Sequence, residues 1–178
     1  VNLWCYQNQL TSLDLTGCTS LVEVLCHDNQ LSSITFGSLP SLAILNAQNN
    51  QFNTLNISSL SALTSLNVGD NQLDSLDVRN GNNTNFAELI ATNNGNLNCI
   101  SVDDATYSTN NWAFNLQFQF DPNSSFSDDC SVVAVPEVIA SGTLSAFSAC
   151  DGLVSAEQNF AVSGSNLTND IVVTPPSG

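Results

Sequence analysis

The sequence predicts a mainly β solenoid of about five coils, closed by a cap and followed by the start of a β-sandwich. Three observations predict this fold. A 21-residue pattern recurs through residues 1–102, one asparagine marks the same position of every copy, and the pattern changes after Cys130. Self-similarity at a fixed period is the signature of stacked repeats, in which each unit buries its apolar edge only against its neighbours.

The marker asparagines define the pattern. Four of them lie 21 residues apart, each followed by Gln and an apolar residue, and a fifth follows after 23 residues. These residues are Asn8, Asn29, Asn50, Asn71 and Asn94. A buried Asn amide can bond backbone groups of its own coil and of the next, so we expect a structural ladder rather than a ligand site. The two extra residues of the fifth copy fall in the Asn- and Gly-rich segment 80–85, which predicts a looser loop.

Apolar residues keep fixed distances from each marker asparagine. Large apolar residues stand five before, two after, five after and seven after it in the first four copies. The position three before it forms an inward column of Cys5, Cys26, Ala47, Val68 and Ala91. No helical period is visible in residues 1–102, so both sides of each coil should be extended or turn-like.

The full pattern, L-x-x-L-x-C/V-x-x-N-x-L-x-x-L-x-L, resembles the leucine-rich repeat. The segments SLDL (12–15) and SLDV (75–78) make it most similar to the 21-residue bacterial class called IRREKO, and closely similar repeats are abundant in secreted and surface proteins of Bacteroidetes. The resemblance implies a right-handed solenoid over residues 1–102, whose N-terminal end is truncated inside a repeat. It implies a fold and no particular chemistry.

The segment after the last repeat resembles the C-terminal cap of the same proteins. The letters NLNCISVDDATYSTNNW and the later FSDDC carry this resemblance, which implies a cap over residues 103–130 and a disulfide between Cys99 and Cys130. Such a bridge fits an extracytoplasmic protein. Because a solenoid end needs a polar-faced cover, Asp103 is the expected N-cap of a short helical turn that carries Tyr107 and Trp112 onto the last repeat.

The cysteines within the repeats are interpreted as core thiols. Cys5 and Cys26 share the small inward column, and Cys18 aligns with an apolar column that holds Leu39 and Leu60. Free Cys packs as a small hydrophobe. A bridge between Cys5 and Cys26 stays open as an alternative, because residues one coil apart lie within disulfide range. No Cys or His spacing typical of a zinc site occurs.

Residues 131–178 change to short alternating stretches separated by Gly, Ser and Asn turns, which predict strands. The segment GTLSAFSACDGLVSAEQNFAVSGSNLTNDIVVTPPSG resembles an immunoglobulin-like β-sandwich repeat frequent in the same secreted proteins. The segment is too short for a sandwich of about 100 residues. We therefore expect only its start, with further modules in a longer chain, and leave open whether Cys150 pairs outside this segment.

Charge excludes several functions. The formal net charge is −15, with 16 acidic residues, one Arg (Arg79), one His (His27) and no Lys. Such a chain cannot neutralise a row of phosphates, which excludes nucleic acid as a partner, and an anionic membrane surface would repel it. Phosphate-binding loops and Schiff-base enzymes need a lysine. No apolar run approaches the 18 residues that indicate a membrane span.

Alternation along the first strand of each repeat predicts the ligand-facing surface. In leucine-rich repeats, residues flanking the inward positions form the concave face. The candidates for ligand contact are Trp4, Tyr6, Leu25, His27, Asn46 and Gln48. The first four form an aromatic and apolar patch, suited to a protein hot spot or to stacking on sugar rings. The alternatives are that preceding repeats cover part of this patch, or that it is ordinary exposed apolar surface.

Three weaker motifs add little chemistry. His27 next to Asp28 lacks the nucleophile, oxyanion hole and pocket that catalysis needs, so no catalytic residue is predicted. The acidic pairs at 103–104 and 128–129 could bind calcium, but helix capping and solvation explain them as well, and no cofactor or metal site is predicted. Residues 74–76 resemble an O-glycosylation motif of Bacteroidetes, which makes Ser75 a candidate for modification.

These features predict a non-catalytic, secreted or cell-surface module for binding or adhesion, with a protein or neutral glycan on its concave face. Two alternatives stay open. One is a passive spacer in a long surface fibre, and the other is an accessory module of a larger secreted hydrolase.

Overall fold

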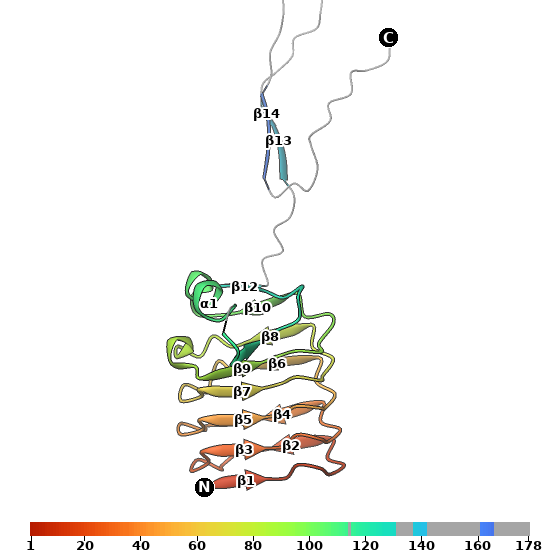
Figure 1. Cartoon of the computed structure of the whole chain (residues 1–178), viewed down its shortest axis with the longest axis vertical. Helices are drawn as coiled ribbons and strands as arrows, with labels where there is room; N and C mark the ends of the chain where they lie inside the picture. Colours follow the sequence, from red (N-terminus) through yellow and green to blue (C-terminus); the bar gives the residue numbers. More distant parts are fainter. Residues whose placement is uncertain (114, 131–136, 142–160, 166–178) are drawn as a thin grey trace, which may run out of the picture. The chain divides into compact units, whose positions relative to one another are not determined.

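The computed structural model describes residues 1–113, 115–130, 137–141 and 161–165. The chain forms two compact units, Val1–Ser131 and Val132–Gly178. The first unit is a stack of coils that follow one another along the chain (Figure 1).

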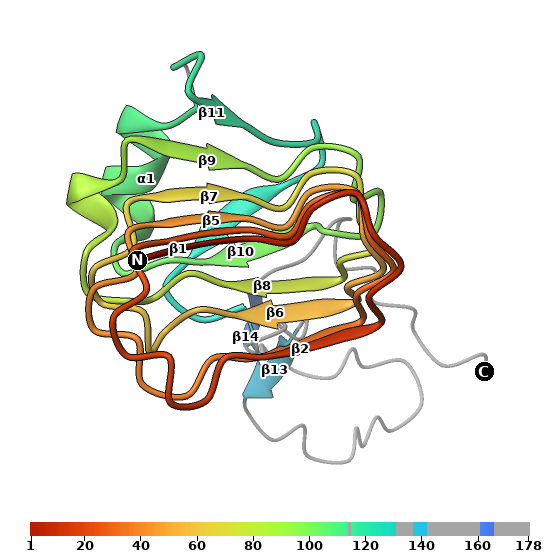
Figure 2. The ribbon, with the colours of Figure 1, turned by 90° about the horizontal axis from the view of Figure 1, so that it is seen from below.

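Each coil contributes one strand to each of two opposite sides of the stack (Figure 2). One side is a six-stranded parallel sheet. Its strands, in spatial order, are β1 (Asn2–Trp4), β3 (Glu23–Leu25), β5 (Ile44–Asn46), β7 (Ser65–Asn67), β9 (Glu88–Ile90) and β11 (Phe118–Gln119). The other side holds a parallel pair and a four-stranded parallel sheet. These are β2 (Ser12–Asp14) with β4 (Ser33–Thr35), and β6 (Thr54–Asn56), β8 (Ser75–Asp77), β10 (Cys99–Ser101) and β12 (Ser125–Ser127).

The strand register follows the sequence repeat, which confirms the predicted mainly β solenoid of about five coils. Leu3 pairs with Val24, and Val24 with Leu45. Leu66 pairs with Leu89 across the longer fifth copy. Each inward position therefore stacks on its equivalent in the next coil, as nearest-neighbour repeats require.

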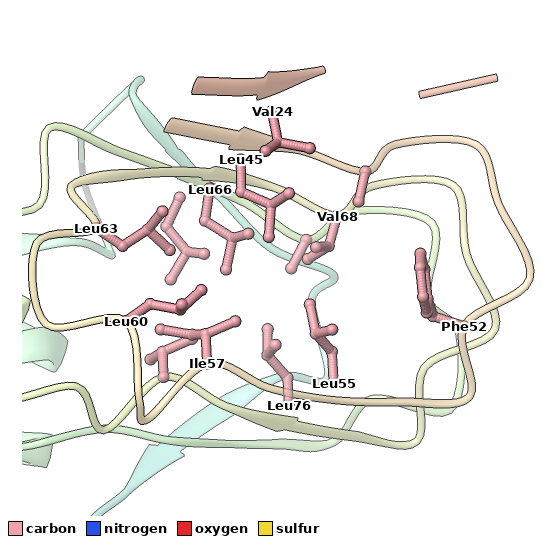
Figure 3. Packing of buried hydrophobic residues seen from close by; sticks show 14 of the residues in the cluster. Val24, Leu45, Phe52, Leu55, Ile57, Leu60, Leu63, Leu66, Val68 and Leu76 are labelled. Atoms are coloured by element: carbon pink, nitrogen blue, oxygen red, sulfur yellow. The ribbon is translucent and has the colours of Figure 1, made fainter. Parts of the chain in front are cut away.

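The core lies between the two sides (Figure 3). Val24, Leu45 and Leu66 point inwards from the six-stranded sheet, and Leu55 and Leu76 come from the opposite side. The first three are 0% exposed, and the last two are 6% and 1% exposed. Burial of each such side chain contributes roughly 1.5–3 kcal/mol. The stacked apolar columns are therefore the main favourable term in folding.

The marker asparagines join adjacent coils. Asn50 is 7% exposed. Its Nδ2 donates to the carbonyls of Cys26 in the preceding coil and of Ala47 and Gln48 in its own coil, each at 3.1 Å. Its Oδ1 accepts the amide of Leu31, also in the preceding coil, at 2.9 Å. The same four bonds recur at Asn29, Asn71 and Asn94.

The residue before each marker asparagine has a left-handed backbone. The φ angles of these five residues lie between 51° and 58°. They are Gln7, Asp28, Asn49, Asp70 and Asn93. Asn and Asp tolerate this conformation better than other residues with a side chain. Four of them also bond across coils in two pairs, since Asn49 Nδ2 donates to Asp28 Oδ1 at 2.6 Å and Asn93 Nδ2 donates to Asp70 Oδ1 at 2.7 Å.

The loose loop expected over residues 80–85 is instead ordered by buried side chains. It contains the 3₁₀ helix η1 (Asn83–Asn85). Asn80 and Asn83 are 6% and 3% exposed. Asn80 Nδ2 donates to the carbonyls of Leu60 at 2.9 Å and Leu63 at 3.2 Å. The expectation was wrong because Asn and Gly content indicates turns, whereas these amides satisfy buried backbone groups.

The cap continues the solenoid as a further coil. β11 pairs with β9 and β12 pairs with β10, so both sheets extend into the cap. Before β11, α1 (Ala105–Asn111) is followed by Trp112, which is 1% exposed. Its ring lies 5.2 Å from that of Phe118 and 5.6 Å from that of Phe126. This aromatic cluster covers the last repeat.

The N-cap of α1 is Asp104, not Asp103 as the sequence predicts. The Asp104 carboxylate accepts the amide of Tyr107 at 2.8 Å. The Asp103 carboxylate instead accepts the amides of Gly81 and Asn83, both at 3.1 Å. The shift of one residue arises because these two amides of the ordered loop need an acceptor.

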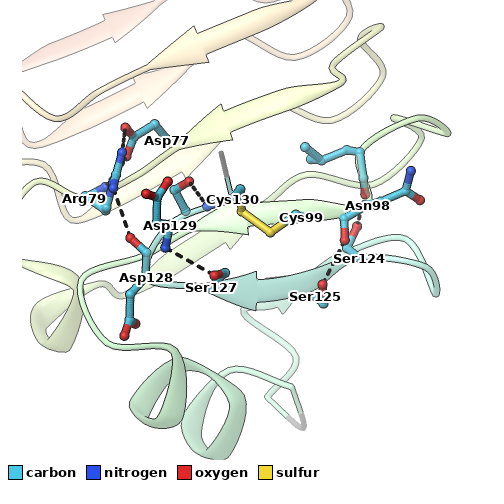
Figure 4. Close-up of a disulfide and its surroundings, with 12 residues drawn as sticks. Asp77, Arg79, Asn98, Cys99, Ser124, Ser125, Ser127, Asp128, Asp129 and Cys130 are labelled. Carbon is cyan, nitrogen blue, oxygen red and sulfur yellow. Dashed lines mark hydrogen bonds and ion pairs between the residues drawn. A yellow bond between two sulfur atoms is a disulfide. The ribbon is translucent and has the colours of Figure 1, made fainter. Parts of the chain in front are cut away.

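A disulfide joins Cys99 to Cys130, as the family resemblance implies (Figure 4). Beside it, Arg79 donates to both carboxylate oxygens of Asp77, at 2.9 and 2.7 Å, and to the carbonyl of Asp128 at 3.0 Å. The hydrogen bond from the guanidinium lowers the pKa of Asp77. The one arginine of the chain thus fastens the cap to the repeats, next to a covalent bond that closes the same segment.

The three cysteines of the repeats have different surroundings. Cys26 is fully buried and Cys5 half-buried, and both are free thiols. Cys18 is exposed, so its interpretation as a core thiol is wrong. Leu39 and Leu60, in the same column, are at most 1% exposed because coils lie on both sides of them. Cys18 belongs to the first coil, which has another coil on only one side among the described residues.

In the second unit, β13 (Glu137–Ser141) and β14 (Ala161–Ser165) form an antiparallel pair. The rest of the β-sandwich expected over residues 131–178, Cys150 included, lies outside the described residues.

Replacing Asn50 with Ala should lower the free energy of unfolding by about 1–3 kcal/mol, because the buried amide of Leu31 loses its acceptor. Urea denaturation measures the change. Asn8→Ala is the matched control, since Asn8 is exposed and its side chain bonds only the carbonyls of Cys5 and Tyr6 within the described chain. Equal losses for both variants would contradict the inter-coil ladder.

Thiol labelling should separate the cysteines. Burial, followed by the neighbouring Cys5, raises the pKa of Cys26 to about 12, and burial raises the pKa of Cys5. Because the thiolate is the reactive form, the three cysteines of the repeats should label in the native protein fastest at the exposed Cys18 and slowest at Cys26. Denatured but unreduced protein should leave Cys99 and Cys130 unmodified in a mass map. Labelling of either would disprove the bridge.

Candidate binding surface

The outward side of the six-stranded sheet is the candidate binding surface, because its residues flank the buried columns. We call it the sheet face. It comprises Trp4, Tyr6, Glu23, Leu25, His27, Ile44, Asn46, Gln48, Ser65, Asn67, Glu88, Ile90 and Thr92. The short strands hold these side chains at the fixed spacing of the solenoid, so the surface is organised before any ligand arrives.

One end of the sheet face carries the aromatic patch, which we define as Trp4, Tyr6, Leu25 and His27. Trp4 is 62% exposed and Tyr6 40% exposed. The Tyr6 ring stacks on the imidazole of His27, with centroids 4.7 Å apart and planes 6° apart. The indole Nε1 of Trp4 donates to Glu23 Oε2 at 2.7 Å. The structure therefore brings the predicted aromatic and apolar candidates together on two adjacent coils.

The middle of the sheet face is a polar network. Gln48 Nε2 donates to Asp70 Oδ2 at 2.8 Å, and Gln48 Oε1 accepts from Asn67 Nδ2 at 3.1 Å. Asn46 Oδ1 accepts the amide of Gln48 at 3.1 Å. Asn46 and Gln48 are both half-buried. These two candidates are already tied to neighbouring residues, so a ligand would have to compete for them.

Acidic side chains lie beside the aromatic patch and further along the sheet face. Glu23 and Glu88 lie on β3 and β9, and Ser65 Oγ donates to Glu88 Oε2 at 2.9 Å. Asp28 follows His27, and Asp28 Oδ2 lies 3.9 Å from His27 Nε2. Arg79, the one arginine of the chain, comes just after β8 in the opposite sheet and is paired there with Asp77. The sheet face therefore presents negative charge with no Lys or Arg among its residues.

His27 has no hydrogen-bond partner on its imidazole among the residues that the structure describes. Its Nε2 is beyond hydrogen-bond distance from Asp28, and its Nδ1 is buried without a hydrogen-bond partner in the described chain. The adjacent thiol of Cys26 is fully buried, and its pKa is raised to about 12. A histidine acts as a general base only within reach of the proton it abstracts, and no such group is placed beside it in the described part of the protein.

The remaining candidates lie elsewhere. Ser75 is exposed on β8 of the opposite sheet and lines a hollow of about 360 Å³, which Asp74 and Arg79 also line. The acidic pairs proposed for calcium are used by the protein: Asp104 caps α1, and Asp128 Oδ1 accepts the amide of Ala105 at 2.7 Å. Over the described ranges, no three His, Cys, Asp or Glu residues converge where they could hold a metal ion. In the same ranges, no helix has the length and apolar character of a membrane span.

Comparison with known proteins supports the fold. No protein-family model matches the chain, and no curated protein matches it in sequence. A solved structure does match: the functional domain of InlJ from Listeria monocytogenes, which includes a cysteine ladder. The two are 25% identical with a TM-score of 0.51, over 70% of this chain and 34% of that chain. This chain therefore matches about a third of the length of that protein chain. In this chain, cysteines occupy two positions of one inward column, Cys5 and Cys26.

Two contacts of the aromatic patch were missed by sequence reasoning. Tyr6 and His27 are one repeat apart, so their stacking could have been found by comparing equivalent positions of adjacent copies. The bond from Trp4 to Glu23 is diagonal, between positions that are not equivalent. Repeat alignment carries no signal for a diagonal contact, because it depends on the rotamers of both side chains.

Trp4 and Trp112 should be distinguishable by fluorescence, because they are 62% and 1% exposed. Trp4→Phe should shift the emission maximum to shorter wavelength and reduce quenching by acrylamide several-fold, since only the buried indole remains. Tyr6→Phe, which keeps both indoles, is the control and should leave quenching close to that of the unchanged protein. Unaltered quenching in the Trp4 variant would show that this side chain is not exposed.

Proposed function

We propose that this solenoid is a non-catalytic binding or adhesion module of a secreted or cell-surface protein. Its ligand is a protein segment that presents basic and apolar groups, held on the sheet face at the aromatic patch. The observation that carries the proposal is the convergence of two exposed aromatic rings, Trp4 and Tyr6, on a surface whose other part is a closed polar network.

The patch has the features of an interface hot spot. Trp and Tyr are the residues most enriched at such positions, because they bury a large area and retain a polar group. Here the Trp4 indole is oriented by Glu23, and the Tyr6 ring is supported by His27. Side chains that are already ordered lose less entropy on binding. Repeat solenoids in general use their extended faces for binding.

Electrostatics favour a basic partner. The chain has a formal net charge of −15, and Glu23, Asp28 and Glu88 lie on or beside the sheet face. A Lys or Arg of the partner could pack on the Trp4 ring while its charge meets Glu23, which combines a cation–π contact with an ion pair. An anionic ligand would be repelled. Association should therefore weaken as salt rises, because exposed charges are screened within about 8–10 Å.

Two features of the chain are consistent with an extracellular location. The chain contains a disulfide, such bonds persist in oxidising compartments, and a strongly acidic surface resists self-association. The InlJ structure supports the fold of the module, and the binding role proposed here depends on the aromatic patch.

A neutral glycan is the second candidate ligand, and the exposed Trp4 ring favours it. Stacking of a sugar ring on an oriented indole needs no charge on the ligand. The two candidates differ in salt dependence: binding of a neutral glycan should not change between low and high salt, whereas binding of a basic protein should fall.

The double variant Trp4→Ala/Tyr6→Ala should lose a few kcal/mol of binding free energy, which is at least a tenfold loss of affinity, with little change in the urea midpoint. Arrays of surface proteins and glycans, followed by calorimetry at two salt concentrations, measure it. Leu116→Ala is the control, because Leu116 is 88% exposed in the cap and lies outside the sheet face. If every interaction of the unchanged protein survives the double substitution, the patch is not the site and the passive-spacer function is favoured.

A further inference from the structure

The chain offers a single bond to proteases of the trypsin class. These enzymes bind a Lys or Arg side chain in an anionic pocket and cut the peptide bond that follows it. The sequence has one Arg and no Lys in 178 residues, so the candidate is the bond between Arg79 and Asn80. Arg79 comes just after β8 and is exposed. Exposure alone does not make it a substrate, because the backbone on both sides must also be free to bind as an extended strand.

The backbone before this bond is held from both sides. Asp77, the last residue of β8, pairs with Asn56 of β6 and with Ser101 of β10. The amide of Ile57 donates to the carbonyl of Asp77, and the amide of Val78 donates to the carbonyl of Ser101, both at 2.9 Å. Both edges of β8 are therefore occupied at this point, and a protease has no free edge to pair with.

The backbone after the bond is held by one carboxylate. The Asp103 side chain accepts the amides of Gly81 and Asn83, both at 3.1 Å. Gly81 has a φ of 75°, which belongs to a turn and not to an extended strand. Asn80 itself is buried. The segment that follows the bond can extend into a protease only if these contacts are broken.

The arginine side chain is occupied as well (Figure 4). Its guanidinium donates to both carboxylate oxygens of Asp77, at 2.9 and 2.7 Å, and to the carbonyl of Asp128 at 3.0 Å. A bidentate pair of this kind is among the stronger hydrogen-bonded contacts of proteins. A protease would have to take Arg79 away from both partners before it could fill its pocket.

Three of these contacts come from one disulfide-closed segment. Ser101, Asp103 and Asp128 all lie between the two cysteines of the bridge. A disulfide stabilises a folded segment mainly by restricting its unfolded states. Without the bridge the segment should open more often, and each opening would release the Arg79 side chain and the backbone beside it together.

The bridge can be reached from solvent at the same place. Cys99 and Cys130 are both half-buried. They line the hollow of about 360 Å³ that Asp77 and Arg79 also line. A small dithiol that enters this hollow meets the sulfur atoms next to the contacts that hold the arginine.

We propose that the bond between Arg79 and Asn80 is a redox-gated cleavage site for arginine-specific endoproteases. It is closed while the bridge is intact and opens when a dithiol reduces the bridge. A thiolate of the dithiol attacks one sulfur, and the other cysteine leaves as a thiolate. The second thiol then displaces the first cysteine, so the bridge gains two electrons and two protons and the reagent becomes a disulfide. The protease then adds water across the bond, which leaves a carboxylate on Arg79 and an amine on Asn80.

Cleavage there would divide the chain by function. Residues 1–79 carry the aromatic patch, and residues 80–178 carry the cap and the second unit. Both cysteines of the bridge belong to the second piece, so no disulfide described in the structure would hold the two pieces together. Reduction followed by one cut would thus separate the aromatic patch from the rest of the chain.

Digestion with trypsin, followed by mass spectrometry, tests the gate. The bridged protein should stay uncut, whereas Cys99→Ala/Cys130→Ala, which needs no reductant, should yield residues 1–79 and 80–178 about tenfold faster or more. Treatment of the unchanged protein with dithiothreitol should have the same effect. The control is Leu116→Arg with the bridge intact, because position 116 is 88% exposed. It should be cut after position 116 while the bond after Arg79 remains whole.

Arg79→Lys supplies an independent readout. Trypsin also accepts Lys, but an ammonium group cannot form the bidentate pair with Asp77. The bridged Arg79→Lys protein should therefore be cut at position 79 several-fold faster than the unchanged protein. Leu116→Lys, compared with Leu116→Arg, corrects for the preference of trypsin between the two residues.

Three results would overturn the proposal. The first is cleavage after Arg79 in the bridged protein as fast as cleavage at position 116 in the control. The second is a rate that neither reduction nor Arg79→Lys raises. The third is labelling of the buried Cys26 after reduction as fast as in urea, since the whole solenoid would then have unfolded and the bridge would not act as a local gate.

Discussion

Each coil of the solenoid turns sharply at a left-handed residue and so directs backbone amides and carbonyls into the stack, away from water. The carboxamide of the marker asparagine meets this demand. At Asn50 one side chain serves the carbonyls of two coils and one amide of the preceding coil. An unpaired polar group in that place costs about 1–3 kcal/mol. The ladder therefore supplies the same inter-coil bonds at the equivalent position of successive coils, beside the apolar columns that stack there.

The same constraint shapes the sheet face. Because every coil repeats one backbone path, outward side chains of adjacent coils are held in columns, as Tyr6 and His27 are. The repeat pattern constrains the inward residues but not the outward ones. Residue type can therefore vary between coils at the outward positions, where a ligand would bind. One end of the face uses them for exposed aromatic rings, and the middle uses them for a self-satisfied polar network. The two regions therefore differ in what they can offer a ligand, although their backbones are equivalent.

The repeat made most of the fold predictable. The spacing of the marker asparagines and the inward columns were enough to place the strands around Val24, Leu45 and Leu66. This is because a repeat buries its apolar edge by stacking on the neighbouring repeats. The predictions were wrong at two places where a coil differs from those in the middle of the stack. Cys18 was assigned to the core from its column, but a column position is buried only if coils lie on both sides. Asp103 was expected to cap α1, but the amides of the longer fifth copy use its carboxylate.

The sequence predicted which residues face outwards at the candidate site. It did not predict the contacts that their side chains make. Alternation identified Trp4 and Tyr6 as outward residues, and the repeat brings them beside Leu25 and His27. The hydrogen bond from Trp4 to Glu23, and the network that ties Gln48 to Asp70, depend on rotamers that no period encodes. The first contact orients the Trp4 ring, which stays 62% exposed, whereas the second occupies the polar atoms of Gln48.

Hydrogen exchange tests the role of the ladder most directly. The amides of Leu31, Phe52 and Leu73 each donate to a marker asparagine rather than to a strand partner. If the ladder ties adjacent coils together, these amides should exchange as slowly as the strand amides of Leu45 and Leu66, with protection that matches the global free energy of unfolding. Exchange at the rate of exposed turn amides would contradict the account, since the coils would then be held together by their strand bonds and apolar columns without the ladder.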